Sequence, residues 1–160
     1  MRNRAWVLAA SVVLLASGIL LAQAAQAPPQ GFPPRNIIPA YHPAPPKGRL
    51  APTLPASDFT DPVTAHCYAA AARIKSVLYQ LPCYCGCDRE DGHTSLLSCY
   101  QDRHTAGCAT CKMELYYAYQ QTRKGRSAAQ IRQGIIRGDW KKVDVTKWSG
   151  PAPAKSPKSK

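Results

Sequence analysis

Residues 81–111 have the sequence LPCYCGCDREDGHTSLLSCYQDRHTAGCATC, which contains six of the seven cysteines of the chain and two of its four histidines. The remaining cysteine is Cys67. In a chain of 160 residues we expect one compact domain. Small domains bury little apolar surface and usually need disulfides or metal ions to be stable. The chemistry of the cysteines therefore decides how this chain folds and what it does.

Three of these cysteines, Cys83, Cys85 and Cys87, alternate with other residues. In an extended segment their thiols would lie on one face, with neighbouring Cα atoms about 6.5–7 Å apart, which is marginal for a disulfide between them. We therefore expect the three thiols to find partners elsewhere in the chain.

A metal site accounts for the number of sulfur atoms better than disulfides do. Three disulfides would leave one thiol unpaired, which is unusual in an oxidising compartment. Several converging thiolates are typical of sites for soft or borderline ions such as Cu(I) and Zn(II). The sequence thus predicts a copper or zinc ion, and the predicted ligands are Cys83, Cys85, Cys87, Cys99, Cys108, Cys111, His93 and His104.

Two other interpretations of the cysteines stay open. In the first, the cysteines form structural disulfides, and the domain is a disulfide-stabilised module that binds another protein. Alternatively, Cys108 and Cys111 open a predicted helix whose dipole lowers the pKa of a thiol, as in an extracytoplasmic thiol–disulfide oxidoreductase or cytochrome-assembly factor.

The sequence has no phosphate-binding loop, zinc-protease helix or nucleophile elbow, so a binding protein is favoured over an enzyme. Cys67 lies on the apolar face of a predicted helix. It is interpreted either as a core residue or as a further metal ligand.

Helical periodicity predicts three helices, over about residues 60–79, 108–123 and 127–138, and a short helical turn within 94–100. No segment has the alternation typical of a strand. The expected fold is mainly α: a small domain of three to four helices with a Cys-rich loop, over residues 57–148.

Capping residues mark the ends of these helices. Thr60 is placed to cap the first helix, and Ser127 with Gln130 forms a capping box at the start of the third. Gly125 and Gly138 are placed to end the second and third helices.

Residues 1–24 have the pattern of an export signal. Arg2 and Arg4 precede an uncharged run, and Ala22-Gln23-Ala24 suits signal peptidase. We expect cleavage after Ala24 and a periplasmic or secreted protein. The length of the run leaves an uncleaved membrane anchor open.

The segments that flank the domain are rich in proline and basic residues. Residues 25–56 predict an extended, disordered linker, and residues 149–160 predict a basic disordered tail that can touch the cell envelope. The net charge of +12 comes mainly from these flanks and residues 1–24, so nucleic acid is not an expected partner of an exported chain. The metal interpretation implies a metal-donor or metal-acceptor protein as partner.

The cysteine stretch resembles a bacterial protein family. Its hexapeptide Pro82–Cys87 is identical to the one that gives the PCYCGC-motif proteins their name, and the similarity extends over about residues 60–140, including His93, Cys99, His104 and the Cys108–Cys111 pair. The resemblance implies an exported or lipid-anchored protein and assigns no reaction. This chain has no cysteine near the predicted cleavage site that could carry a lipid.

Overall fold

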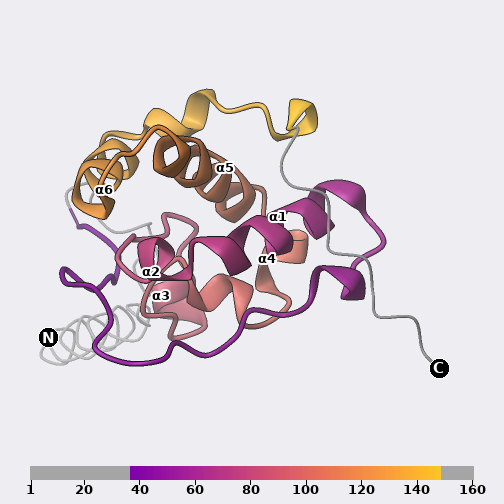
Figure 1. Cartoon of the computed structure of the whole chain (residues 1–160), viewed down its shortest axis with the longest axis horizontal. Helices are drawn as coiled ribbons and strands as arrows, with labels where there is room; N and C mark the ends of the chain where they lie inside the picture. Colours follow the sequence, from indigo (N-terminus) through magenta and orange to yellow (C-terminus); the bar gives the residue numbers. More distant parts are fainter. Residues whose placement is uncertain (1–36, 149–160) are drawn as a thin grey trace, which may run out of the picture. The chain divides into compact units, whose positions relative to one another are not determined.

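The computed structural model of the protein describes residues 37–148 (Figure 1). The predicted export signal, the first part of the predicted linker and the predicted basic tail lie outside these residues. The described chain contains helices and no strand, which confirms the mainly α fold. Its α-helices are α1 (Pro62–Arg73), α2 (Lys75–Leu78), α3 (Cys87–Glu90), α4 (His104–Gly107), α5 (Ala109–Arg123) and α6 (Ala128–Arg137).

Short 3-10 helices complete the architecture, at Ala56–Asp58, Ser98–Tyr100, Asp139–Lys142 and Val145–Lys147. The second of these lies within the segment where the sequence predicts a helical turn. None of the helices in residues 37–148 has the length and apolarity needed to cross a membrane.

The first predicted helix is divided in two. Asp61, and not Thr60, caps α1: its carboxylate accepts the N–H of Thr64 at 2.8 Å. The helix stops at Ile74, whose φ of −121° lies outside the helical region, and α2 then begins at Lys75. The prediction of one helix up to residue 79 was wrong because the buried side chain of Ile74 fits the core at this bend.

The helix α5 organises the domain, since it packs against α1, α2, α4 and α6 (Figure 1). Cys108 is its N-cap residue rather than its first helical residue. The helix α6 begins with the predicted capping box and ends at Gly138. It lies close to α5 because Gly134 has no side chain: a Cβ there would overlap the hydroxyl of Tyr117.

Aromatic and aliphatic side chains fill the interior. Tyr68 on α1 connects distant segments of the chain, because its ring stacks on Phe59 and meets the edge of Tyr100. The largest fully buried apolar side chains are Tyr68, Leu78, Leu81, Pro82, Leu96, Leu97, Tyr100, Leu115, Ile131 and Ile135. Five buried cysteines, Cys67, Cys83, Cys87, Cys99 and Cys111, belong to the same cluster. The apolar core therefore shields their sulfur atoms from solvent.

Residues 37–56 lie against the helices. Leu54 packs on the core, and its N–H donates to the carbonyl of Tyr100 at 2.9 Å. The ring of His42 stacks on Tyr79 with 3.8 Å between centroids. The predicted free linker is therefore not confirmed for these residues. Isolated apolar and aromatic side chains between the prolines make enough contacts to hold the segment in place.

Candidate metal centre

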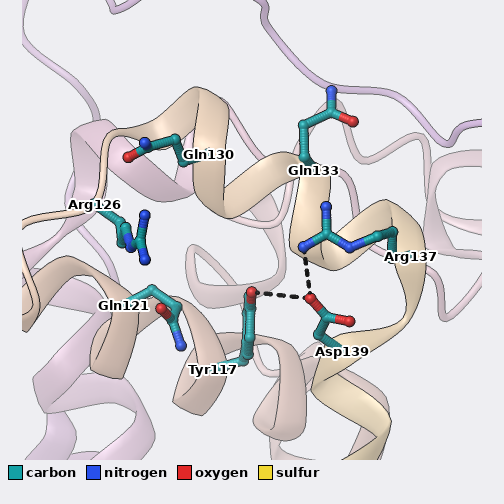
Figure 2. A pocket seen from close by; sticks show the side chains of 7 residues that line it. All are labelled: Tyr117, Gln121, Arg126, Gln130, Gln133, Arg137 and Asp139. Atoms are coloured by element: carbon teal, nitrogen blue, oxygen red, sulfur yellow. Dashed lines mark hydrogen bonds and ion pairs between the residues drawn. The ribbon is translucent and has the colours of Figure 1, made fainter.

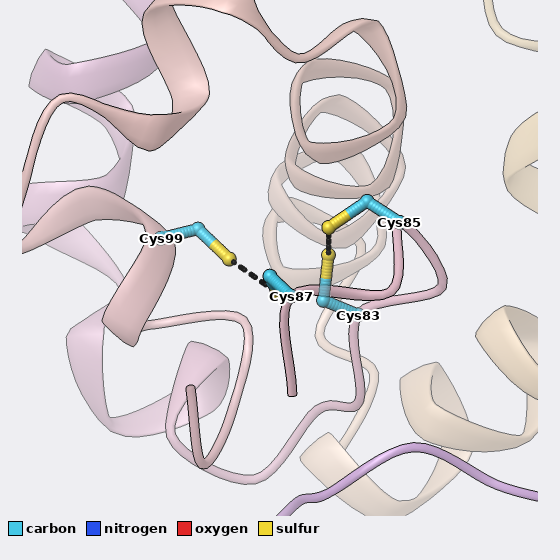
Figure 3. A group of neighbouring side chains, drawn as sticks. All are labelled: Cys83, Cys85, Cys87 and Cys99. Carbon is cyan, nitrogen blue, oxygen red and sulfur yellow. Dashed lines mark hydrogen bonds between the residues drawn. The ribbon is translucent and has the colours of Figure 1, made fainter. Parts of the chain in front are cut away.

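A tight turn brings the cysteines of the Pro82–Cys87 hexapeptide together. Gly86 has a φ of +98°, in the left-handed region that favours glycine, and it leads directly into α3. The expected extended conformation is therefore wrong. The turn, and not strand alternation, directs Cys83 and Cys85 to each other, with 3.2 Å between their Sγ atoms. Cys87, the first residue of α3, reaches Cys99 with 3.4 Å between the sulfurs (Figure 3).

These four cysteines form the first group of ligands (Figure 3). The sulfur atoms of Cys83, Cys85, Cys87 and Cys99 all lie within 4.8 Å of one another. In a tetrahedral zinc–thiolate site, Zn–S bonds of ~2.3 Å place the sulfurs ~3.8 Å apart. The sulfur–sulfur distances of the group, from 3.2 Å up to 4.8 Å, lie on either side of this value, so small shifts would suit the group to one ion.

A second group forms where this turn meets the start of α5. The ligand atoms of Cys85, His104, Cys108 and Cys111 also lie within 4.8 Å of one another. Cys85 Sγ lies 3.4 Å from His104 Nε2 and 3.7 Å from Cys111 Sγ. The structure thus brings together seven of the eight predicted ligands in two groups that share Cys85. A third group, Asp91, His93 and His104, contains the eighth and shares His104 with the second group.

The eighth predicted ligand, His93, lies beside the first group. Its Nδ1 is 3.4 Å from Cys99 Sγ, and its Nε2 is 3.0 Å from the carboxylate of Asp102. His104 is held in a similar way, because its Nδ1 lies 3.1 Å from the carboxylate of Asp91. A carboxylate on the far nitrogen of an imidazole is the usual arrangement around metal-binding histidines, since it fixes the tautomer and the ring.

The two carboxylates were missed by the sequence analysis. Each aspartate precedes a histidine by two residues, yet it holds the other histidine: Asp91 contacts His104, and Asp102 contacts His93. The repeated Asp-x-His spacing was a signal of their involvement. The crossed pairing could not be predicted, because it depends on how the intervening residues turn back.

Buried hydrogen bonds hold the backbone of the ligand residues. The hydroxyl of Tyr100 donates to the carbonyl of Cys111 at 2.9 Å, and the hydroxyl of Thr105 donates to the carbonyl of Cys99 at 2.8 Å. The donors are almost fully buried. Water cannot easily compete for these bonds, so the ligand residues have fixed positions.

Without a bound cation, the cysteines differ in the pKa of their thiols, so some of them lose their proton more readily than others. Hydrogen bonds with Cys108 and Cys111 hold the pKa of Cys85 far below its usual range. The pKa of Cys99 is also lowered, chiefly by Cys111. Contacts with Cys111 and Cys85 raise the pKa of Cys83 well above the usual value. Negative charge therefore collects on a few sulfurs, and a bound cation would displace the protons of the others.

Glu114 on α5 is a buried carboxyl group next to these sulfurs. Its Oε1 accepts the N–H of Tyr84 at 2.9 Å, and its Oε2 has no hydrogen-bond partner within residues 37–148. Burial raises the pKa of Glu114 well above its usual value, against the lowering effect of Cys83 and of the Tyr84 N–H. Burial therefore favours the neutral form of this carboxyl group next to the thiolates.

Cys67 takes no part in either group. It is fully buried on α1, and burial raises its pKa to about 12. Of the two interpretations of Cys67, the structure supports the core residue.

A polar hollow of about 510 Å³ lies between α5 and α6 (Figure 2). Asp139 at its edge accepts hydrogen bonds from Arg137 at 2.8 Å and from Tyr117 at 3.5 Å. The lining residues are Tyr117, Gln121, Arg126, Gln130, Gln133, Arg137 and Asp139. None is a cysteine or histidine, so the hollow is separate from the candidate metal centre.

The sequence model of a family described as "protein of unknown function with PCYCGC motif" matches residues 50–151. The chain belongs to this family. The matched region contains all seven cysteines and both histidines of the candidate centre. No curated protein and no solved structure matches the chain. The family establishes the resemblance seen in the hexapeptide and assigns no activity.

Proposed function

We propose that this protein is an exported metal-binding protein that holds soft ions, copper(I) in the first place and zinc(II) in the second, for storage or transfer. The observation that carries the proposal is the pair of four-ligand groups: the four ligand atoms of each group lie within 4.8 Å of one another, and together the groups contain six sulfurs and one imidazole nitrogen. Metal ligands cluster in this way, whereas buried thiols that serve only as core residues do not need one another.

The surroundings of the sulfurs support the same function. Both histidines have a carboxylate on the nitrogen that faces away from the sulfurs, as metal-binding histidines do. Burial raises the pKa of Glu114 and so favours its neutral form, which does not repel thiolates. Disulfides explain neither of these features.

Copper is proposed before zinc on chemical grounds. Thiolates are soft ligands that select Cu(I) and Zn(II), and Cu(I) is the softer of these two ions. Four-sulfur and three-sulfur–one-nitrogen groups are also the usual zinc sets. The identity of the ion is therefore an outcome of the experiment below.

Export and transfer are parts of the proposal. Residues 1–24 have the pattern of an export signal, which supports an extracytoplasmic location. Cys85, His104 and Cys108 are only half-buried, so a donor or acceptor protein could reach them with its own ligands. The proposed partner is such a metal-transfer protein.

One observation favours a second candidate function, thiol–disulfide exchange. Cys85 is half-buried and has a lowered pKa, and the sulfur of Cys83 is 3.2 Å away. The Cys85 thiolate could attack a disulfide of a partner protein, and Cys83 could resolve the mixed disulfide. Two thiols of this chain would then become one disulfide, and the partner disulfide would become two thiols.

The test is native mass spectrometry of the chain isolated from its own compartment, followed by anaerobic titration with Cu(I) or Zn(II). Bound ions add mass, and each disulfide removes the mass of two hydrogen atoms. We expect bound ions and free thiols. Disulfides without ions, in a chain that takes up no metal after reduction, would overturn the proposal and support thiol–disulfide exchange.

Matched cysteine variants assign the ligands in the same titration. Cys85→Ser and Cys111→Ser keep the size of the side chain and remove the soft ligand, so we expect fewer ions per chain. Cys67→Ala is the control because Cys67 lies outside both groups. Full metal occupancy in both serine variants would contradict the proposed site.

A further inference from the structure

We infer that the centre holds two ions of different accessibility, an inner ion and an outer ion, which are bridged by the thiolate of Cys85. The inference rests on the proposed metal-binding function and goes beyond it. The inner group is Cys83, Cys85, Cys87 and Cys99, and the outer group is Cys85, His104, Cys108 and Cys111.

The two groups offer seven ligand atoms, which exceeds the four that one tetrahedral ion binds. Each group already offers the four ligands of a closed tetrahedral site. The two groups have only Cys85 in common, and its sulfur lies 3.2 Å from Cys83 Sγ on the inner side and 3.7 Å from Cys111 Sγ on the outer side. A thiolate bonded to two ions at ~2.3 Å each would place these ions no more than ~4.6 Å apart. One sulfur between the groups is therefore geometrically suited to bridge them.

Charge favours the same arrangement. Six thiolates around a single cation would leave several uncompensated negative charges in a largely buried site, which is strongly unfavourable. A second cation offsets part of this charge. A bridging thiolate also contributes its charge to both ions, so the pair needs fewer anionic ligands than two separate sites.

The groups differ in their access to solvent. In the inner group Cys83, Cys87 and Cys99 are at most 3% exposed. In the outer group Cys85, His104 and Cys108 are half-buried and Cys111 is buried. An incoming ligand can therefore approach the outer ion directly, whereas the inner ion is held by three buried cysteines and has Cys85 as its half-buried ligand. The outer position is the entry and exit of the centre, and the inner position retains its ion.

Cadmium-113 provides the test, because Cd(II) is a thiophilic NMR-active substitute for zinc. We expect the full chain loaded anaerobically with ¹¹³Cd to show two resonances that are coupled to each other through the shared sulfur. A limiting amount of the chelator EDTA should remove the outer resonance first, so that release occurs in two phases of one equivalent each.

Variants identify the two positions. His104→Gln should lose the outer resonance and the fast phase and should keep the inner resonance. His66→Gln is the control, since His66 lies on α1 outside all the ligand groups. Cys87→Ser should impair the inner position instead.

Each other outcome has a distinct meaning. A single resonance at saturation would overturn the two-ion centre and leave metal binding intact. Two resonances without coupling would overturn the bridge. Equal release of both ions to EDTA would overturn the inner and outer assignment. No bound cadmium, with Cu(I) and Zn(II) also unbound, would overturn the proposed function itself.

Discussion

At the scale of single residues, Gly86 has the most demanding position in the cysteine turn. Its φ is +98°, and an added Cβ would lie 3.3 Å from the guanidinium of Arg89. The left-handed conformation costs a residue with a side chain ~1–2 kcal/mol. The direction of Cys85 and Cys87 depends on this bend, so a substitution here affects both groups of ligands.

We therefore expect Gly86→Ala to lower stability by about 1–2 kcal/mol and to weaken metal binding. Gly107→Ala is the matched control, because a Cβ at Gly107 meets nothing within 4 Å and its φ is not positive. Urea denaturation and metal titration of both variants check the prediction. Equal effects of the two substitutions would show that the turn does not require glycine.

Glu114 makes stability depend on pH. Burial raises its pKa in the folded chain, so above the usual glutamate pKa the folded state retains a proton that the unfolded state releases. The folded state then binds more protons, and stability falls as pH rises from the usual pKa towards the raised one.

The substitution Glu114→Gln should remove this loss, because the amide oxygen still accepts the N–H of Tyr84 and carries no charge. We expect the thermal midpoint of the metal-free variant to exceed that of the parent at neutral pH and to approach it in acid. Glu90→Gln is the control, since Glu90 is exposed. Parallel curves for Glu114→Gln and the parent from acid to neutral pH would contradict the assigned proton.

At the scale of elements, the start of α1 depends on one cap. Asp61 accepts the N–H of Thr64, and loss of such a cap costs about 1 kcal/mol. We expect Asp61→Ala to lower stability by this amount and Thr60→Ala to have little effect. Thermal unfolding of both variants checks which residue is the cap. A larger loss in Thr60→Ala would restore the cap predicted from the sequence.

The elements also show which features the sequence could predict. The capping box at Ser127 and the end of α6 at Gly138 are local signals, and the structure confirms both. The break at Ile74 has no local signal in the sequence, whereas in the structure the side chain of Ile74 is buried in the core cluster. Packing of this kind cannot be seen in a single sequence.

The candidate site was predictable to a similar extent. The eight ligands were selected by residue type and spacing, and the structure brings seven of them into two groups that share Cys85, while His93 lies in a third group with Asp91 and His104. The division into two groups was not predicted. It depends on the turn at Gly86, which places Cys85 between the other cysteines of the hexapeptide and the start of α5.

At the scale of the whole molecule, the metal-binding region contains little structure that could persist alone. The helices α3 and α4 have four residues each, and isolated helices shorter than ~12 residues are marginal in water. The longer helices α1, α5 and α6 pack on one another and on an apolar core. The two parts of the domain should therefore differ in their dependence on metal.

We expect removal of metal under reducing conditions to expose the backbone of residues 81–108 to hydrogen exchange while α5 and α6 keep most of their protection. Mass spectrometry of peptides from the exchanged protein measures both regions. Renewed addition of the ion is the control and should restore protection. An unchanged exchange pattern after chelation would mean that the apolar core alone holds the loop.

The crossed aspartate–histidine pairs have a consequence for how the family varies. The carboxylate of Asp91 contacts His104, and that of Asp102 contacts His93. The histidine of each Asp-x-His segment is therefore held by the aspartate of the other segment. A substitution in one segment removes the support of a side chain in the other, and only a matching change there can compensate for it. Across related sequences Asp91 should therefore covary with His104, and Asp102 with His93, more strongly than either aspartate covaries with the histidine two residues after it.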